Sequence, residues 1–173
     1  KEPKFLKNGI LLQRRLIMSA QEDISNFIKH LQNYEYKVDQ QAKAELGEVF
    51  TPIKSVDQQL DHIEKIDKDA FKDISKNTID ICAGNGQFLS EVVVRKLQNG
   101  LSLEQSLKST YGVDISEKNV NECRERLLCG QEHLKHIVEQ NIVCADALRY
   151  HYRFDGSDPY KTANDLHFDR LFG

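Results

Sequence analysis

Short apolar runs, separated by segments with helical periodicity, dominate the second half of the chain. Residues 78–83, 110–113 and 141–144 are such runs, and each predicts a β-strand. Residues 168–172 repeat the pattern and predict the start of a fourth strand. Because helical segments lie between the strands, we expect a parallel sheet with right-handed crossovers. The predicted fold class is therefore α/β, with a doubly wound, mostly parallel sheet.

Apolar residues at helical spacing predict the helices, and cap residues predict where several of them begin or end. Ser19 and Glu22 form a capping-box pattern at the start of a helix over residues 20–32. Thr51 is expected to cap a second helix, with Pro52 at its first position. Three more helices are expected in the α/β part: one after Gly86 that ends at Gly100, one over 101–109, and one from Ser116 to Gly130.

These patterns divide the chain into two parts. Residues 1–46 are expected to form an N-terminal helical extension, and residues 47–173 hold the α/β part. The extension begins with a basic arm, because residues 1–18 carry five basic side chains and one acidic one, whereas the whole chain has a net charge of −3. Two interpretations of the arm stay open: a solvated tail or helix, and an arm that contacts phosphate groups.

Composition places the protein among soluble globular proteins. It has 173 residues, of which 39% are hydrophobic and 29% are charged. No apolar run approaches the ~20 residues of a membrane helix and the N-terminus shows no signal peptide, so we expect a cytoplasmic protein with no membrane partner. The four cysteines lack zinc-like spacing, and His133 and His136 lack a third ligand, so no metal is expected.

Acidic residues and glycines follow the predicted strands at the edge of the sheet where α/β proteins bind ligands. The first strand leads into a loop from Asp80 to Gly86, whose glycines allow positive φ and the close approach of a ligand at a helix start. Asp114 and Asp146 end the next two strands, and they suit the ribose hydroxyls and the exocyclic amine of adenosine. Each aspartate alone is typical of a turn, but three in register predict an adenosine-like ligand.

Motifs before and after this loop indicate more closely which ligand binds there. The segment Gly47-Glu48-Val49-Phe50-Thr51-Pro52 precedes the loop Asp80-Ile81-Cys82-Ala83-Gly84-Asn85-Gly86-Gln87-Phe88-Leu89, and residues 111–115 and 141–148 follow in order. Residues 47–173 therefore resemble the amino-methylating DNA methyltransferases of the gamma order, which include modification subunits of type I restriction systems and related type II enzymes. The resemblance implies a Rossmann-like methyltransferase fold, S-adenosylmethionine as cofactor, DNA as substrate, and a restriction or specificity subunit as a partner.

The resemblance also implies a role for each cofactor-binding residue. The methionine end of the cofactor would lie against Phe50, Thr51 and Pro52. The amino acid and ribose would approach the loop motif, through Asp80, Ala83, Gly84, Gly86 and Phe88. Asp114 would accept the ribose hydroxyls, with Ile115 against the adenine face. Asp146 and the backbone of Ala147 would contact the adenine edge.

The family's catalytic tetrapeptide, Asn/Asp/Ser-Pro-Pro-aromatic, is not present in this chain. Ser157-Asp158-Pro159-Tyr160 lacks the second proline. Residues 168–173 resemble the run that leads into the tetrapeptide, so we expect it directly after Gly173 in a longer protein, with truncation favoured over a degenerate motif. No catalytic residue is therefore predicted within the 173 residues, and this chain alone is expected to have no methylating activity.

Three functions are compatible with these patterns. The expected one is the cofactor-binding part of a DNA methyltransferase in a restriction–modification context, which acts on adenine N6 or, less often, on cytosine N4. The second is a non-catalytic S-adenosylmethionine-binding or structural module of a larger protein. The third, an NAD-dependent oxidoreductase, is disfavoured because Leu89 stands where the dinucleotide fingerprint has its third glycine or alanine.

Overall fold

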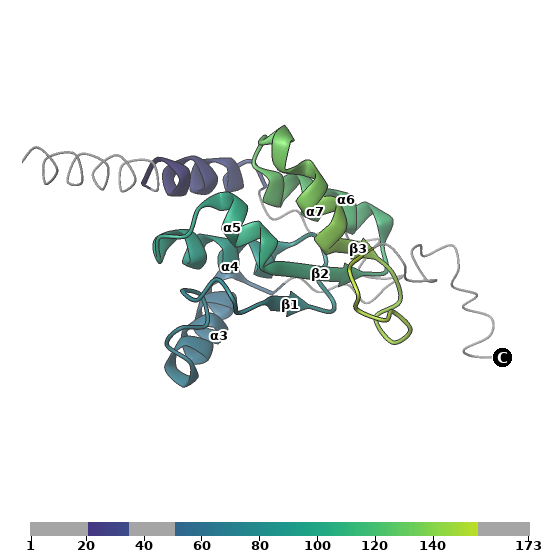
Figure 1. The fold of residues 1–173 in the computed structure, drawn as a ribbon, viewed down its shortest axis with the longest axis horizontal. Helices are drawn as coiled ribbons and strands as arrows, with labels where there is room; N and C mark the ends of the chain where they lie inside the picture. Colours follow the sequence, from purple (N-terminus) through teal and green to yellow (C-terminus); the bar gives the residue numbers. More distant parts are fainter. Residues whose placement is uncertain (1–20, 35–50, 156–173) are drawn as a thin grey trace, which may run out of the picture.

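A small parallel sheet lies at the centre of the protein, seen in the computed structural model, which describes residues 21–34 and 51–155 (Figure 1). Its strands are β1 (Thr78–Asp80), β2 (Thr110–Asp114) and β3 (Ile142–Cys144), in the order β1-β2-β3. Both strand pairs are parallel, as the alternation of strands and helices predicted. The protein is therefore a mixed α/β structure, with three strands in its described part.

The strands are shorter or longer than predicted where the chain turns. β1 ends at Asp80, three residues before the predicted end, because residues 81–86 already form the turn into the next helix. The Ala83 amide still donates to the Val113 carbonyl, at 3.0 Å, so the turn stays attached to β2. The predicted fourth strand lies outside the described residues.

Helices fill both crossovers of the sheet. Between β1 and β2 lie α4 (Gln87–Gln98) and α5 (Leu103–Lys108), and α5 has the Ser102–Gln105 capping box that the sequence predicted. Between β2 and β3 the chain forms α6 (Glu117–Leu128), the 3-10 helix η1 (Glu132–Leu134) and α7 (Lys135–Asn141). Sequence analysis missed α7, although Leu134, Ile137 and Val138 are buried at helical spacing.

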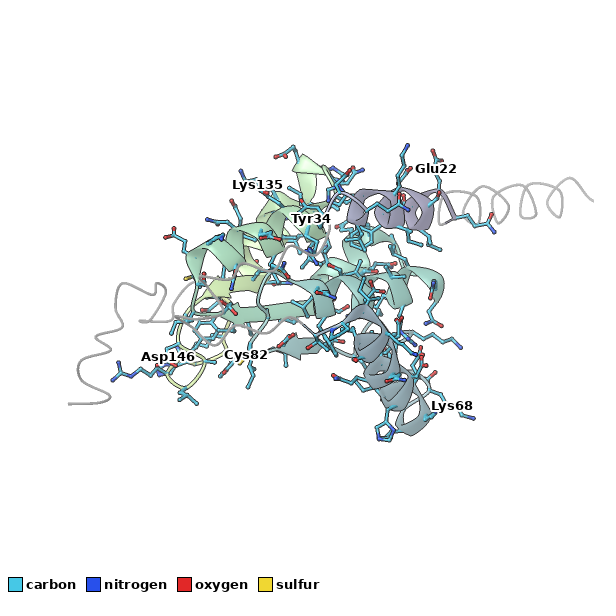
Figure 2. All side chains as sticks on the ribbon, turned by 180° about the vertical axis from the view of Figure 1, so that it is seen from behind. Glu22, Tyr34, Lys68, Cys82, Lys135 and Asp146 are labelled. Atoms are coloured by element: carbon cyan, nitrogen blue, oxygen red, sulfur yellow. The ribbon has the colours of Figure 1, made fainter. Side chains whose placement is uncertain are left out.

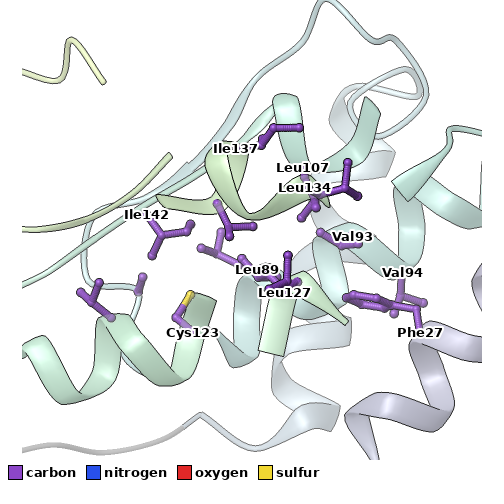
Figure 3. Close-up of a cluster of buried hydrophobic side chains, with 14 of the residues drawn as sticks. Phe27, Leu89, Val93, Val94, Leu107, Cys123, Leu127, Leu134, Ile137 and Ile142 are labelled. Atoms are coloured by element: carbon purple, nitrogen blue, oxygen red, sulfur yellow. The ribbon is translucent and has the colours of Figure 1, made fainter. Parts of the chain in front are cut away.

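The main hydrophobic core lies between these helices and one face of the sheet (Figure 3). Ile142 and Cys144 point into it from β3, whereas Val143 points to the opposite face, as alternation along a strand requires. The predicted helix over 20–32 is present over residues 21–31 and packs into the same core through Phe27, which is fully buried beside Val94. The described part of the extension thus shares a core with the α/β part.

A second cluster joins α3 (Ile53–Ile66) to α4. Val56 and Leu60 of α3 pack against Phe71 and Val92. Arg95 of α4 adds ion pairs to acidic side chains of α3, to Asp57, Asp61 and Glu64. The predicted Thr51 cap is wrong, because α3 begins at Ile53 with Pro52 at the N-cap position and has no side-chain cap bond. A proline ring has no acceptor, so the first amides of α3 lack the predicted hydroxyl partner.

A glycine of β2 lets α4 lie close to the sheet. A Cβ atom on Gly112 would stand 2.8 Å from Cδ1 of Leu89 and 3.1 Å from the Cβ of Ala83. Leu89 is fully buried in this space. In dinucleotide-binding folds the third glycine of the fingerprint, on the helix, provides this close approach. Here the small residue lies on the strand and the large one on the helix.

A lysine is buried under the start of β2. Lys96 is 1% exposed, and its ammonium donates to the carbonyl and hydroxyl of Ser109, at 2.7 and 2.8 Å, and to the hydroxyl of Thr110 at 3.1 Å. Three acceptors match the three ammonium protons. None of them is charged, and burial lowers the pKa of Lys96 to about 8.

We predict that the stability contributed by Lys96 rises with pH. The unfolded chain keeps the Lys96 proton up to the ordinary lysine pKa of 10.5, whereas the folded chain releases it near pH 8, so the unfolded state binds more protons between these values. The free energy of unfolding of the wild type should therefore rise by about 2 kcal/mol more than that of Lys96→Met between about pH 7 and pH 9.5.

Urea unfolding at several pH values measures this difference. Lys108→Met is the matched control, because Lys108 is exposed at the end of α5 and pairs with Glu104. Its pH profile should run parallel to that of the wild type. A parallel profile for Lys96→Met as well would show that burial does not shift the Lys96 pKa.

Candidate functional site

A cavity of about 730 Å³ opens beyond the carboxyl ends of β1 and β2, beside the start of α4. Its lining comes from the first turns of α3, from the loop after β1, from α4 and from the β2–α6 connection. The lining residues are Thr51, Val56, Gln59, Ile79, Asp80, Ile81, Cys82, Ala83, Gly84, Asn85, Gln87, Phe88, Asp114, Ile115, Ser116 and Asn119. This is the edge of the sheet where the sequence placed an adenosine-like ligand.

The three strand-end aspartates all make the same local hydrogen bond. In each case one carboxylate oxygen accepts the amide two residues further on: Cys82 to Asp80 at 3.0 Å, Ser116 to Asp114 at 2.9 Å, and Leu148 to Asp146 at 2.9 Å. This is the Asx-turn geometry that aspartate favours at the end of a strand. One oxygen of each carboxylate therefore shapes the turn, and the other is directed elsewhere.

Asp114 uses its second oxygen to hold the glycine loop. Oδ2 accepts the Gly84 amide at 2.8 Å, across from β2 to the loop after β1. The side chain of Asn119 also lies within 3.4 Å of Oδ1, from the first turn of α6. These contacts fix the carboxylate in the cavity wall, where its remaining lone pairs can accept hydroxyl donors from a ligand.

The two glycines of the loop have different constraints. Both have left-handed backbone conformations, with φ of 53° at Gly84 and 83° at Gly86. Gly86 does not line the cavity: a Cβ atom there would stand 2.5 Å from Sγ of Cys123. Gly86 is therefore required for the packing of the loop on α6. It is also the N-cap residue of α4, a helix whose start has no side-chain cap hydrogen bond. Only Gly84 lies at the cavity itself.

The cavity wall is acidic. Asp80 and Asp114 line it, and the lining contains no lysine, arginine or histidine. Burial raises the pKa of Asp80, the Cys82 amide opposes this, and the nearby Asp114 charge raises it further. Burial and the same two carboxylates raise the pKa of the exposed Cys82 thiol, so Cys82 is not an activated nucleophile. Such a wall favours a cationic ligand or one rich in hydroxyl donors.

Most of the predicted cofactor residues come together at this cavity. Those that line it are Thr51, Asp80, Ala83, Gly84, Phe88, Asp114 and Ile115. Pro52 is exposed next to Thr51 without lining the cavity, and Phe50 lies outside the described residues. Thr51 is joined to α4 by its carbonyl, which accepts the Gln87 side-chain amide at 2.9 Å.

Asp146 and Ala147 do not line the cavity. Asp146 turns the chain after β3, and the Ala147 carbonyl accepts the hydroxyl of Tyr152. Burial raises the pKa of Tyr152, and the nearby Cys82 and Asp146 raise it further. Figure 2 shows Cys82 and Asp146 at the same end of the molecule.

Sequence analysis missed the polar residues that the connections bring to the cavity: Gln59, Asn85, Gln87, Ser116 and Asn119. The sequence positions of two of these residues could have indicated that they lie at the site. Gln59 lies two helical turns after Thr51 and Pro52, and Asn85 stands between the two loop glycines. The Asn85 side chain is directed by Glu122 of α6, a contact that motif spacing does not contain.

Neither a match to a known protein nor a metal or membrane-spanning site among the described residues indicates a function. No protein-family model, curated protein or solved structure was found to match the chain. Among residues 21–34 and 51–155, no three histidine, cysteine or acidic side chains are placed to hold a metal ion. In the same ranges, no helix is both long and apolar enough to cross a membrane. The cavity is therefore the feature of the described residues that points to a function.

We predict that Gly86→Ala destabilises the protein more than Gly100→Ala. Both glycines have positive φ, but the space around Gly100 is open within 4 Å, so alanine there adds only backbone strain of about 1–2 kcal/mol. At Gly86 the clash with Cys123 adds an overpacking cost, typically about 1–3 kcal/mol. Urea unfolding measures both losses, and Cys123→Ala in the Gly86→Ala background should recover part of the larger one. Equal losses at the two glycines would contradict this packing role.

Proposed function

We propose that the cavity binds S-adenosylmethionine, and that the protein belongs to the machinery that transfers its methyl group to an exocyclic amine of DNA, with adenine N6 as the expected target. The observation that carries the proposal is the acidic wall: Asp80 and Asp114 face the cavity without a basic side chain. S-adenosylmethionine brings a sulfonium and an ammonium group, and both are attracted by these carboxylates. The resemblance of residues 47–173 to gamma-order DNA methyltransferases supports the same ligand.

The remaining parts of the cavity fit the other groups of this cofactor. Asp114 is fixed by Gly84 and Ser116 and keeps acceptor capacity for ribose hydroxyls. Phe88 and Ile115 add apolar surface for the adenine and the methionine chain. The start of α4 has no side-chain cap, so its first amides are suited to the cofactor carboxylate. When bound, the cofactor would supply the electrophilic methyl group, and these residues would hold it in place.

The same wall disfavours a nicotinamide dinucleotide. A pyrophosphate carries two negative charges, and Asp80 and Asp114 would repel it with no basic residue in the lining to compensate. The packing of Leu89 on Gly112 also departs from the dinucleotide fingerprint. A non-catalytic S-adenosylmethionine-binding module remains the second candidate, because the cofactor-binding residues would be the same in both.

We also propose that the described sheet is one half of a doubly wound sheet. Parallel sheets are normally covered on both faces. The face opposite the helices carries a cavity of about 550 Å³, lined by Ile79, Ile81 and Tyr111 and by the segment at Tyr152 and Phe154. Ile79 and Ile81 are 45% and 50% exposed, at a strand that forms one edge of the described sheet. A further strand beside β1 would continue the sheet at this edge.

We predict that the chain binds S-adenosylmethionine and does not bind NAD, measured by isothermal titration calorimetry. Asp114→Asn keeps an oxygen for the Ser116 amide, but it removes the charge of this side chain and places an NH2 donor where Oδ2 accepts the Gly84 amide. Its affinity for S-adenosylmethionine should fall roughly 10- to 100-fold, the scale of a lost charged hydrogen bond. Asp73→Asn is the matched control, because Asp73 makes the same turn, with Ser75, on the exposed surface. Binding of NAD with no binding of S-adenosylmethionine would contradict the proposal.

Methyl transfer is tested with the protein expressed from its own gene. Labelled methyl groups should pass from S-adenosylmethionine to unmethylated DNA, and mass spectrometry of the digested DNA should find N6-methyladenine. Asp114→Asn in that protein should lose activity in proportion to its lost affinity at low cofactor concentration. A protein that binds the cofactor but leaves DNA unmethylated would support the non-catalytic module instead.

A further inference from the structure

Helix α3 forms one side of the cavity, and the side chains that it brings there carry no charge. Val56 and Gln59 line the cavity, together with Thr51 just before the helix. Val56 is fully buried in the cluster that packs α3 against α4, which includes Phe88, so the place of this helix is fixed (Figure 1). Gln59 lies almost one turn further along and is exposed, so a ligand in the cavity can reach its side chain.

Among the described residues that line the cavity, Gln59 is the side-chain amide whose hydrogen-bonding groups are unused. The lining has four such amides, and three of them already donate within the protein: Asn85 to a carboxylate of α6, Gln87 to a backbone carbonyl just before α3, and Asn119 to Asp114. Gln59 has no hydrogen-bond partner in the described part of the chain. Its two N–H donors and its carbonyl are therefore available to a ligand.

The acidic wall determines which ligand group lies on the α3 side. Both carboxylates of the lining, Asp80 and Asp114, come from the sheet side, at the ends of β1 and β2. They attract the ammonium and sulfonium groups of S-adenosylmethionine and repel its carboxylate. Since the lining residues include no lysine, arginine or histidine, that carboxylate needs neutral donors. Electrostatics favours the α3 side for it, because α3 adds no acidic group to the lining.

The Gln59 amide fits this carboxylate. Side chains on a helix lean toward its N-terminus, so the amide reaches back toward Val56 and the start of α3. The Thr51 carbonyl accepts the Gln87 side chain at 2.9 Å, and this bond joins the start of α3 to the first turn of α4. The proposed place of the cofactor carboxylate, at the first amides of α4, therefore borders the part of the lining that α3 supplies.

We propose that Gln59 is a specificity-determining residue, which donates from Nε2 to the carboxylate of the bound cofactor. The contact distinguishes ligands with an amino-acid carboxylate from those with an amine alone. The inference rests on the proposed function for the identity of the ligand. It adds a residue outside the two motif segments, 47–52 and 80–89, that the resemblance assigns to the cofactor.

The first experiment removes the donor and compares two ligands. Decarboxylated S-adenosylmethionine keeps the adenosine, sulfonium and ammonium groups and lacks only the carboxylate. In the full chain, Gln59→Leu should weaken the binding of S-adenosylmethionine about tenfold, the scale of a lost hydrogen bond to a charged group, as measured by calorimetry. Its affinity for the decarboxylated ligand should stay unchanged. Equal losses for the two ligands would show that Gln59 affects the cavity as a whole, and they overturn the carboxylate contact.

The second experiment places a negative charge at the same position. Gln59→Glu has nearly the shape of the wild-type side chain, but its carboxylate only accepts hydrogen bonds and repels a ligand carboxylate. The affinity for S-adenosylmethionine should fall roughly 30-fold or more. The decarboxylated ligand carries only positive charges, so it should bind at least as tightly as it binds the wild type. The opposite order of the two ligands overturns the proposal.

Gln58 provides the matched control. It is exposed, directly precedes Gln59 on α3 and does not line the cavity. Consecutive residues of a helix point about 100° apart, so Gln58→Leu and Gln58→Glu make the same chemical changes on a different face. Each should change the affinity for either ligand by less than about twofold, because solvent screens an exposed charge. A loss in Gln58→Glu as large as that in Gln59→Glu would show a long-range effect of charge and overturn the contact.

The outcomes separate this inference from the proposed function. A wild-type chain that does not bind S-adenosylmethionine overturns the proposed function, and this inference with it. A wild-type chain that binds, together with an unchanged affinity in Gln59→Leu, overturns the contact and leaves the proposed function in place. Thermal melts should show each variant folded, because both glutamines are exposed. If Gln59→Leu does not fold, Gln59→Met replaces it, with the same expected loss.

Discussion

The side chain and carbonyl of Asp114 join the three strand ends on which the site is built. Its Oδ2 holds the Gly84 amide of the loop after β1, and its Oδ1 holds the Ser116 amide at the start of α6. Its carbonyl accepts the Ala145 amide after β3, at 2.9 Å. Removal of this carboxylate would release the glycine loop and the start of α6 together. The position of the cavity wall therefore depends on one residue that is also a proposed ligand contact.

Close packing around small residues sets where the start of α4 lies. Gly86 leaves room for Cys123 of α6, and Gly112 leaves room for Leu89 of α4. Both contacts draw α4 toward the end of the sheet and toward α6, and the main core then fills around Leu89, Val93 and Leu97. Since the first turn of α4 lines the cavity, these packing constraints and the Asp114 hydrogen bonds act on the same short loop.

Local patterns in the sequence predicted the elements well where burial follows a simple period. The helix over 21–31, α4, α5, α6 and the three strands all appear near the expected positions. The failures arise where a second element decides the outcome. Lys96 lies in a helical pattern, and only the end of α5 supplies the Ser109 and Thr110 oxygens that allow its burial. Pro52 begins α3 in place of a Thr51 cap, because helix starts shift by a residue without changing the apolar spacing.

In the candidate site, too, local features could be predicted from the sequence, and features that depend on a second element could not. Aspartates at strand ends and glycines in the loop could be recognised from spacing, because each has a local backbone role that the sequence expresses. Asp114 lines the cavity and Asp146 does not, because Asp114 ends β2, which pairs with β1, whereas Asp146 follows β3, one strand further away. The orientation of Asn85 depends on a carboxylate 37 residues later.

Charge links these geometric details to function. Burial and the nearby Asp114 charge raise the pKa of Asp80, and no basic side chain in the lining opposes this. A cation near the two carboxylates would reduce the repulsion between them, so a positively charged ligand would bind here favourably. The wall therefore favours a ligand that carries positive charge and donor groups, and it disfavours a pyrophosphate.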